Sequence, residues 1–198
     1  MQMMEAFMKF PMLALAAALL AVSGPTQSTG FPDRAFTHGG SVRLNLAAAA
    51  YHLRGREDDR IQVRWSSSKP AMKDRLHADV EVKGARAVIW TIAPHNSGAR
   101  FDIDLPSRCD LDVDLNAGDL EVRNIEGNKN VSMWAGDVTI DVGKAELYRR
   151  VEASVRFGDI SAPPFNRSTG GIFRSLSWSG SGKYIVRAKL FAGDLKLR

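Results

Sequence analysis

The acidic residues Asp110, Asp112 and Asp114 alternate with apolar residues, and their spacing is the first in the sequence that suggests chemistry. Alternate residues of a strand share one face, so these carboxylates could bind calcium or act as acid and base on a polysaccharide. Glu121 stands at the twelfth position of a calcium-type loop, but Leu115 occupies the sixth, where such a loop requires glycine. We therefore interpret the acids as a solvated outer face that opposes aggregation, and we expect no metal site.

Other enzyme signatures are missing from the sequence. Ser66-Ser-Ser-Lys69 matches a Ser-x-x-Lys pattern, but the partner motifs of that enzyme class are absent and we expect a polar turn. The four histidines are widely separated, without the spacing of metal ligands. Cys109 is the one cysteine, which excludes an internal disulfide and any multi-cysteine metal site. We expect no catalytic residues, no cofactor and no enzymatic activity.

The elements that would position these side chains are strands. Alternation of apolar and polar residues recurs along the chain, in 61–65, 80–82, 101–105, 111–115, 120–122 and 138–142. The residues between these stretches are rich in glycine, asparagine, proline and serine, which favour turns. A length of 198 residues, 44% of them hydrophobic, suits one core. The sequence predicts a single all-β domain.

A short repeat indicates how the strands are arranged. Each copy has glycine, aspartate and then two apolar residues separated by one position; the pairs are Gly118-Asp119, Gly136-Asp137, Gly158-Asp159 and Gly193-Asp194. Glycine permits a positive φ at a corner, and the aspartate can accept hydrogen bonds from backbone N–H groups that the corner leaves unpaired. The repeat predicts stacked coils of a β-solenoid, with Leu120 and Val138 in one interior column.

Two further copies are expected where the Gly-Asp pair is missing. Residues 48–53 match the repeat with alanines in place of glycine and aspartate. From Gly118 the spacings to the following glycines are 18, 22 and 35 residues, so the last is near two units. A copy without the motif is therefore predicted around 171–177.

The N-terminal residues have the pattern of a secretory signal peptide. Lys9 precedes the apolar run 12–22, and small residues follow it. The run is shorter than the roughly 20 apolar residues of a membrane-spanning helix, although an uncleaved anchor is the alternative. We expect a signal peptide over 1–23, cleaved after Ser23, a linker over 24–35 and the domain over 36–198. The acidic Glu5 is unusual in such a segment, and Met8 is an alternative start to Met1.

These features together resemble a known protein family. The Gly-Asp-apolar-x-apolar steps, the export signal and the closing run Ala-Gly-Asp-Leu-Lys-Leu (192–197) are similar to those of the bacterial putative-adhesin domain family of unknown function. The resemblance covers 36–198 and is strongest over 101–162. It implies a right-handed β-solenoid and an exported or envelope-associated protein, and it brings no catalytic residues.

Charge and aromatic residues suggest where a partner would bind. Residues 101–142 carry ten acids and three bases, whereas 143–198 carry eleven bases and four acids. A basic surface near the C-terminus could bind envelope glycans or anionic lipid headgroups, with Trp178, Tyr184, Arg187 and Lys189 as candidates. The alternatives are charge pairing between coils and an aromatic cap on the open end of the stack. We expect no nucleic-acid binding, because basic and aromatic residues do not interleave as in single-strand binders.

The leading hypothesis is a non-enzymatic, exported protein of the periplasm, the cell surface or the medium, with no transmembrane segment after signal cleavage. It would present an adhesin-like β-solenoid as a binding or scaffolding surface. One alternative is a carbohydrate-active β-helix enzyme that acts on acidic polysaccharide through the acids near Asp112. Another is an envelope scaffold that self-associates end to end.

Overall fold

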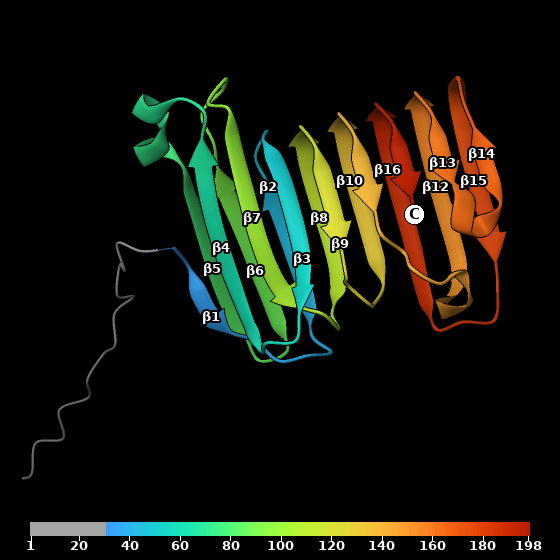
Figure 1. Cartoon of the computed structure of the whole chain (residues 1–198), viewed down its shortest axis with the longest axis horizontal. Helices are drawn as coiled ribbons and strands as arrows, with labels where there is room; N and C mark the ends of the chain where they lie inside the picture. The colour runs from blue at the N-terminus through green and yellow to red at the C-terminus, as the bar shows by residue number, and fades with distance from the viewer. Residues whose placement is uncertain (1–30) are drawn as a thin grey trace, which may run out of the picture.

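The computed structural model describes residues 31–198, so the expected signal peptide (1–23) lies outside the described residues. These residues form two mixed β-sheets with three short 3₁₀ helices, and the all-β prediction is confirmed (Figure 1). The helices are Pro70–Arg75, Ala145–Leu147 and Pro163–Phe165. In spatial order, the eight-stranded sheet contains β15 (Ile172–Ser179), β12 (Tyr148–Phe157), β16 (Tyr184–Ala192), β10 (Lys129–Ala135), β8 (Asp110–Ala117), β2 (Ser41–Leu46), β6 (Arg86–Ile92) and β5 (His77–Lys83). The nine-stranded sheet contains β1 (Asp33–Ala35), β4 (Arg60–Ser67), β7 (Ala99–Pro106), β3 (Ala50–Arg56), β9 (Leu120–Arg123), β11 (Val138–Ile140), β17 (Leu195–Leu197), β13 (Ile160–Ala162) and β14 (Arg167–Thr169).

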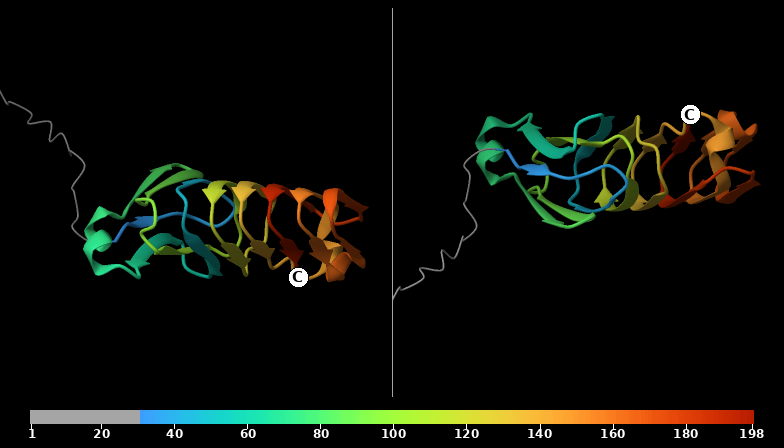
Figure 2. Two further views of the ribbon diagram at one scale, coloured as in Figure 1. Left: turned by 90° about the horizontal axis from the view of Figure 1, so that it is seen from above. Right: turned by 90° about the horizontal axis from the view of Figure 1, so that it is seen from below.

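Most of the domain is built from two-strand units that cross from one sheet to the other. In each unit a strand of the eight-stranded sheet is followed by a strand of the nine-stranded sheet; the units are β2–β3, β6–β7, β8–β9, β10–β11, β12–β13 and β16–β17. Neighbouring units pair in parallel in both sheets. The antiparallel strands β5 and β4 flank the stack at one end, and β15 and β14 flank it at the other. Figure 2 shows the sheets as two layers facing one another.

The units do not stack in the order of the sequence. A solenoid threaded in sequence order would place the Gly193 copy beyond the Gly158 copy. Instead, β16–β17 lies between β10–β11 and β12–β13. At the other end of the stack, β2–β3 lies between β6–β7 and β8–β9. The chain therefore adds β6–β7 and β8–β9 on opposite sides of its first unit, and later returns to insert β16–β17 between two earlier units.

Two segments differ from the sequence-based expectation. The copy predicted around 171–177 falls on β15, which runs antiparallel to the repeat units, as does β14 before it. The chain reverses there because Asn166, after the helix Pro163–Phe165, adopts the left-handed conformation (φ 53°, ψ 44°). At the N-terminus, Asp33–Ala35 was expected in the linker but forms β1, which pairs with β4 and lengthens the nine-stranded sheet.

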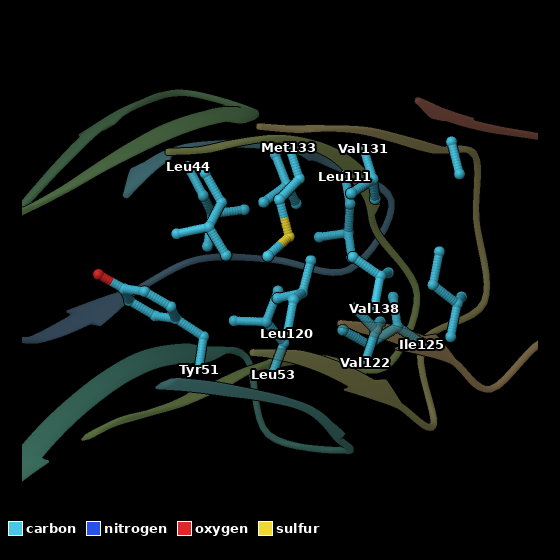
Figure 3. Packing of buried hydrophobic residues seen from close by; sticks show 14 of the residues in the cluster. Leu44, Tyr51, Leu53, Leu111, Leu120, Val122, Ile125, Val131, Met133 and Val138 are labelled. Atoms are coloured by element: carbon cyan, nitrogen blue, oxygen red, sulfur yellow. The ribbon is translucent and has the colours of Figure 1, made fainter. Parts of the chain in front are cut away.

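The space between the sheets is filled by one apolar core. Alternate residues of each strand point inward, and their side chains interdigitate (Figure 3). In the nine-stranded sheet, Leu120 pairs with Val138, and Val138 pairs with Leu195. Tyr51 and Ile160 extend this row in either direction, and all five side chains are at most 2% exposed. No unit could bury these residues alone, so each unit depends on its neighbours.

The interior row predicts a sharp contrast between two adjacent positions. Val138→Asp should lower the free energy of unfolding by about 3–5 kcal/mol, because it buries an unpaired carboxylate between Leu120 and Leu195. Thr139→Asp should change it by less than about 1 kcal/mol, because Thr139 faces outward between Glu121 and Lys196. Urea denaturation followed by circular dichroism measures both. Equal losses would contradict the assignment of faces.

Candidate functional site

The corners between the two sheets form a column of glycines. Gly118, Gly136, Gly193 and Gly158 have φ angles of 128°, 121°, 127° and 138°. They approach one another closely: a Cβ on Gly136 would lie 1.9 Å from the carbonyl oxygen of Gly118, and one on Gly193 would lie 1.9 Å from that of Gly136. The column begins at Ala49, whose carbonyl oxygen faces Gly118. Any side chain at these corners would force the units apart.

The aspartates after these glycines link successive corners. The Asp194 N–H donates to Oδ1 of Asp137 at 3.0 Å, and the Asp159 N–H donates to Oδ1 of Asp194 at 3.0 Å. The N–H of Gly171 donates to Oδ1 of Asp159 at 3.1 Å. Asp119 is exposed, and no hydrogen bond from residues 31–198 reaches its carboxylate. The three bonded carboxylates satisfy backbone donors and stabilise the corner.

The corner column also aligns the side chains that precede it. Two residues before each corner glycine, the outward-facing position is occupied by Asn116, Trp134, Phe191 or Arg156. The parallel register of β8, β10, β16 and β12 brings these four residues side by side on the outer face of the eight-stranded sheet. Side chains from four units are therefore adjacent on this face and can form one continuous surface.

This row contributes Trp134, Phe191 and Arg156 to an exposed aromatic surface, which Phe157 and Phe173 complete. The rings of Trp134 and Phe191 stack with centroids 4.0 Å apart and planes 3° from parallel. The Arg156 guanidinium lies 5.0 Å from the Phe173 centroid and 5.5 Å from the Phe191 centroid, within the range of cation–π attraction. Trp134 is 59% exposed and Phe173 67%. A contiguous apolar patch of this kind usually marks an interaction site.

An open depression of about 460 Å³ adjoins the aromatic surface. Polar side chains from three strands line it together with Trp134, namely Asp114, Asn116, Ser132 and Lys189. A flat aromatic ring beside hydrogen-bonding groups suits a ligand that has both an apolar face and polar edges. This depression and the aromatic surface are the candidate functional site.

The two aromatic residues expected in a binding surface lie elsewhere. Trp178 lies two residues after the buried Leu176, on the same strand face, and packs against Phe165, with ring centroids 4.9 Å apart, at the end of the stack. The Tyr184 hydroxyl donates to Oε1 of Glu126 at 2.9 Å, at the opposite end of β16 from Phe191. Neither ring belongs to the aromatic surface.

The two basic residues of the same expectation do face outward from β16. Arg187 donates through Nε to Oε2 of Glu152 at 3.0 Å. Lys189 lies closer to the corner, where it lines the depression. Of the four expected binding residues, Lys189 therefore contributes to the candidate site.

Trp134, the central residue of the site, was not identified from the sequence. The signal was present, because alternation from Val131 and Met133 places Trp134 outward, and aligning the repeats places it beside Phe191. Residue type alone favoured the aromatic residues of 165–191, where the rings are denser.

Two carboxylates of the acidic strand β8 are hydrogen bonded to asparagines. Asp110 accepts hydrogen bonds from the backbone N–H and the side-chain amide of Asn128, and Asp112 accepts one from Asn130 at 2.8 Å. Within 31–198 no three potential ligands gather as a metal site would require. In the same residues, no helix has the length and apolar character needed to cross a bilayer.

One lysine is buried inside the domain. Lys129 is 1% exposed, and its Nζ donates to the Tyr148 hydroxyl at 2.9 Å and to the Gly127 carbonyl at 3.3 Å. Burial lowers the pKa of Lys129 to about 8 and raises the pKa of the neighbouring Cys109 thiol to about 12. The thiol therefore stays protonated and unreactive at neutral pH.

Comparisons with known proteins identify a fold but no family. No protein-family model matches the sequence, and no curated protein is significantly similar to it. Among solved structures, a putative cell adhesion protein from Clostridium sporogenes is similar, with a TM-score of 0.50 and 15% identity over 85% of this chain and 98% of that chain. A putative adhesin from Bacteroides fragilis aligns with a TM-score of 0.26 and 12% identity over 88% of this chain and 99% of that chain. At 15% identity the first likeness shows a shared fold.

The glycine column predicts that a single methyl group is enough to disrupt a corner. Gly136→Ala should lower the free energy of unfolding by about 3 kcal/mol, because its Cβ would clash with the Gly118 backbone at a positive φ. Gly143→Ala is the matched control: φ is also positive (62°), but no atom lies within 4 Å of the new Cβ, so the loss should be about 1–2 kcal/mol. Denaturant titration measures both. A smaller loss at Gly136 than at Gly143 would contradict the close approach.

Lys129 predicts a stability that rises with pH. In the unfolded chain a lysine keeps its proton up to about pH 10.4, whereas folded Lys129 loses it near pH 8. The unfolded state then holds more protons between these values, so the free energy of unfolding should rise there by up to about 1.4 kcal/mol per pH unit. The free energy of unfolding is measured from pH 7.5 to 9.5 for the wild-type protein and for Lys129→Met, which lacks the titrating group and should not show the rise. Parallel curves for the two proteins would show that the folded lysine keeps its ordinary pKa.

Proposed function

We propose that the chain is an exported, non-enzymatic, adhesin-like protein of the cell envelope, whose aromatic surface contacts its partner. The observation that carries the proposal is the exposed, ordered stack of Trp134 on Phe191 beside an open depression. Monomeric soluble proteins rarely leave such contiguous apolar area in water unless a partner covers it. The signal-peptide pattern of 1–23 supports export to the periplasm, the cell surface or the medium.

The proposed architecture is a right-handed β-solenoid with one inserted unit, β16–β17. The column of glycine corners and the parallel pairing of six units support stacked coils. The hand is supported by the strong general preference for right-handed crossovers between parallel strands of one sheet. Such a stack holds outward-facing residues on rigid strands, so a binding surface needs little ordering when the partner arrives.

The proposed partners are glycans or anionic lipid headgroups of the envelope. Arg156 and Lys189 border the aromatic surface and supply positive charge. Polar and aromatic groups that converge on a shallow, open site support ligand binding.

Retention on isolated bacterial envelope fractions tests the proposal, with cytoplasmic fractions as the comparison. The wild-type protein should bind envelope material, and Trp134→Ala should reduce retention by about tenfold or more. Trp90→Ala is the matched control, because Trp90 is also an exposed tryptophan on the eight-stranded sheet but lies on β6, away from the aromatic surface. No binding by the wild-type protein, or equal losses in both variants, would contradict the proposed function.

A further inference from the structure

We propose that the uncovered face of the Trp134 indole is a subsite for a neutral pyranose ring, whose hydroxyl groups are bound by Asp114, Asn116 and Ser132. The proposal deepens the proposed function, on which it rests, by naming the ligand class of the aromatic surface. It selects uncharged sugars over acidic polysaccharides, lipids and protein partners.

The two faces of Trp134 have different neighbours. Phe191, on β16, covers one face through the parallel stack. The other face is directed toward β8, on the opposite side of β10. There, the pairings Met133–Leu115 and Ala135–Ala117 place Asn116 beside Trp134. The uncovered face therefore looks over polar residues of the adjoining strand, about 5 Å away in the sheet.

The polar groups beside this face are available to a ligand. Asp114 is paired in register with Ser132, next to Asn116 on the same strand face. None of these three side chains is hydrogen bonded to another residue within 31–198, whereas Asp110 and Asp112 on the same strand are bonded to asparagines. A carboxylate, an amide and a hydroxyl together offer both acceptors and donors, as the hydroxyl groups of a sugar require.

The shape of the site matches a sugar ring. A pyranose has an apolar face of C–H groups and a rim of hydroxyls, so its ring can lie against the indole while its rim reaches the side chains of β8 and β10. Phe191 holds the indole in place, and Arg156 in turn lies over Phe191. The aromatic wall is therefore preorganised, which lowers the entropic cost of binding.

Local charge selects against anionic ligands on this side of Trp134. Asp112 and Asp114 both face outward from β8; Arg43 on β2 pairs with Asp112 at 3.7 Å, and the bases that line the depression, Lys189 and Arg156, belong to strands on the other side of β10. A uronic acid or a phosphate placed directly beside Asp114 would meet like charge, because Lys189, which lines the same depression, lies across Ser132 from Asp114. An acyl chain would leave the three polar side chains desolvated and unpaired.

Tryptophan indole signals in ¹H–¹⁵N NMR spectra test the subsite directly. The chain has four tryptophans, and Trp134→Phe identifies the Trp134 signal. Neutral trisaccharides (cellotriose, maltotriose and the N-acetylglucosamine trimer) are titrated into the full protein, with trigalacturonate as the acidic comparison. At least one neutral trisaccharide should shift the Trp134 signal with a Kd of about 1 mM or below, and trigalacturonate should bind at least about tenfold more weakly.

Variants separate the subsite from the proposed function. Asp114→Ala and Trp134→Ala should each weaken neutral sugar binding by about tenfold or more, whereas Trp90→Ala and Asp79→Ala, on the far strands β6 and β5, should not. Unchanged circular dichroism confirms that each variant is folded. The subsite is overturned if none of the neutral trisaccharides shifts the Trp134 signal at a concentration of about 20 mM. It is also overturned if trigalacturonate binds more tightly than every neutral trisaccharide, or if the Asp114→Ala variant binds neutral sugar with the wild-type Kd. If envelope binding still depends on Trp134 in that case, the proposed function stands with an acidic glycan or a lipid headgroup as the partner.

Discussion

The close approach of successive corners is the constraint on which the rest of the structure depends. Hydrogen-bonded strands lie about 5 Å apart, and at Gly136 and Gly193 this spacing leaves no room for a side chain. Because the corners pass from one sheet to the other, their spacing ties the two sheets to a common register. The interior row through Val138 and the outer row through Trp134 both follow from it. One backbone requirement thus positions the core and the candidate site.

Much of the local structure could be predicted from the sequence, because local patterns carry it. Alternation marked the strands of 101–140, and glycine followed by aspartate marked the corners. The spatial order of the units could not be predicted, because the copies are chemically interchangeable. The corner at Gly193 approaches the backbone of Gly136 about as closely as the corner at Gly158 approaches the backbone of Gly193, so the corners themselves do not distinguish their neighbours. The choice of neighbour depends on long-range packing, and no short pattern records it.

The candidate site shows the same division between local and distant information. Trp134 and Trp178 are alike in type, and each stands in an alternating strand. Trp178 packs on Phe165 at the end of the stack, a contact that depends on the reversal at Asn166. Trp134 instead meets Phe191, which is distant in sequence and becomes adjacent because β16 is inserted beside β10. The stack of the two rings is therefore a product of the topology.

The insertion of β16–β17 has a consequence for how the chain reaches its final state. The strands β16 and β17, which follow all the other repeat units along the chain, lie in the interior of both sheets, between β10–β11 and β12–β13. Until they emerge from the ribosome, the units on either side lack their shared neighbour and expose apolar edges that are prone to aggregate. Assembly can be completed only after β16 and β17 have been synthesised, through contacts between distant residues, which favours slow closure. A chain with this topology remains open during translation, in a form that a translocation channel or a chaperone can still engage.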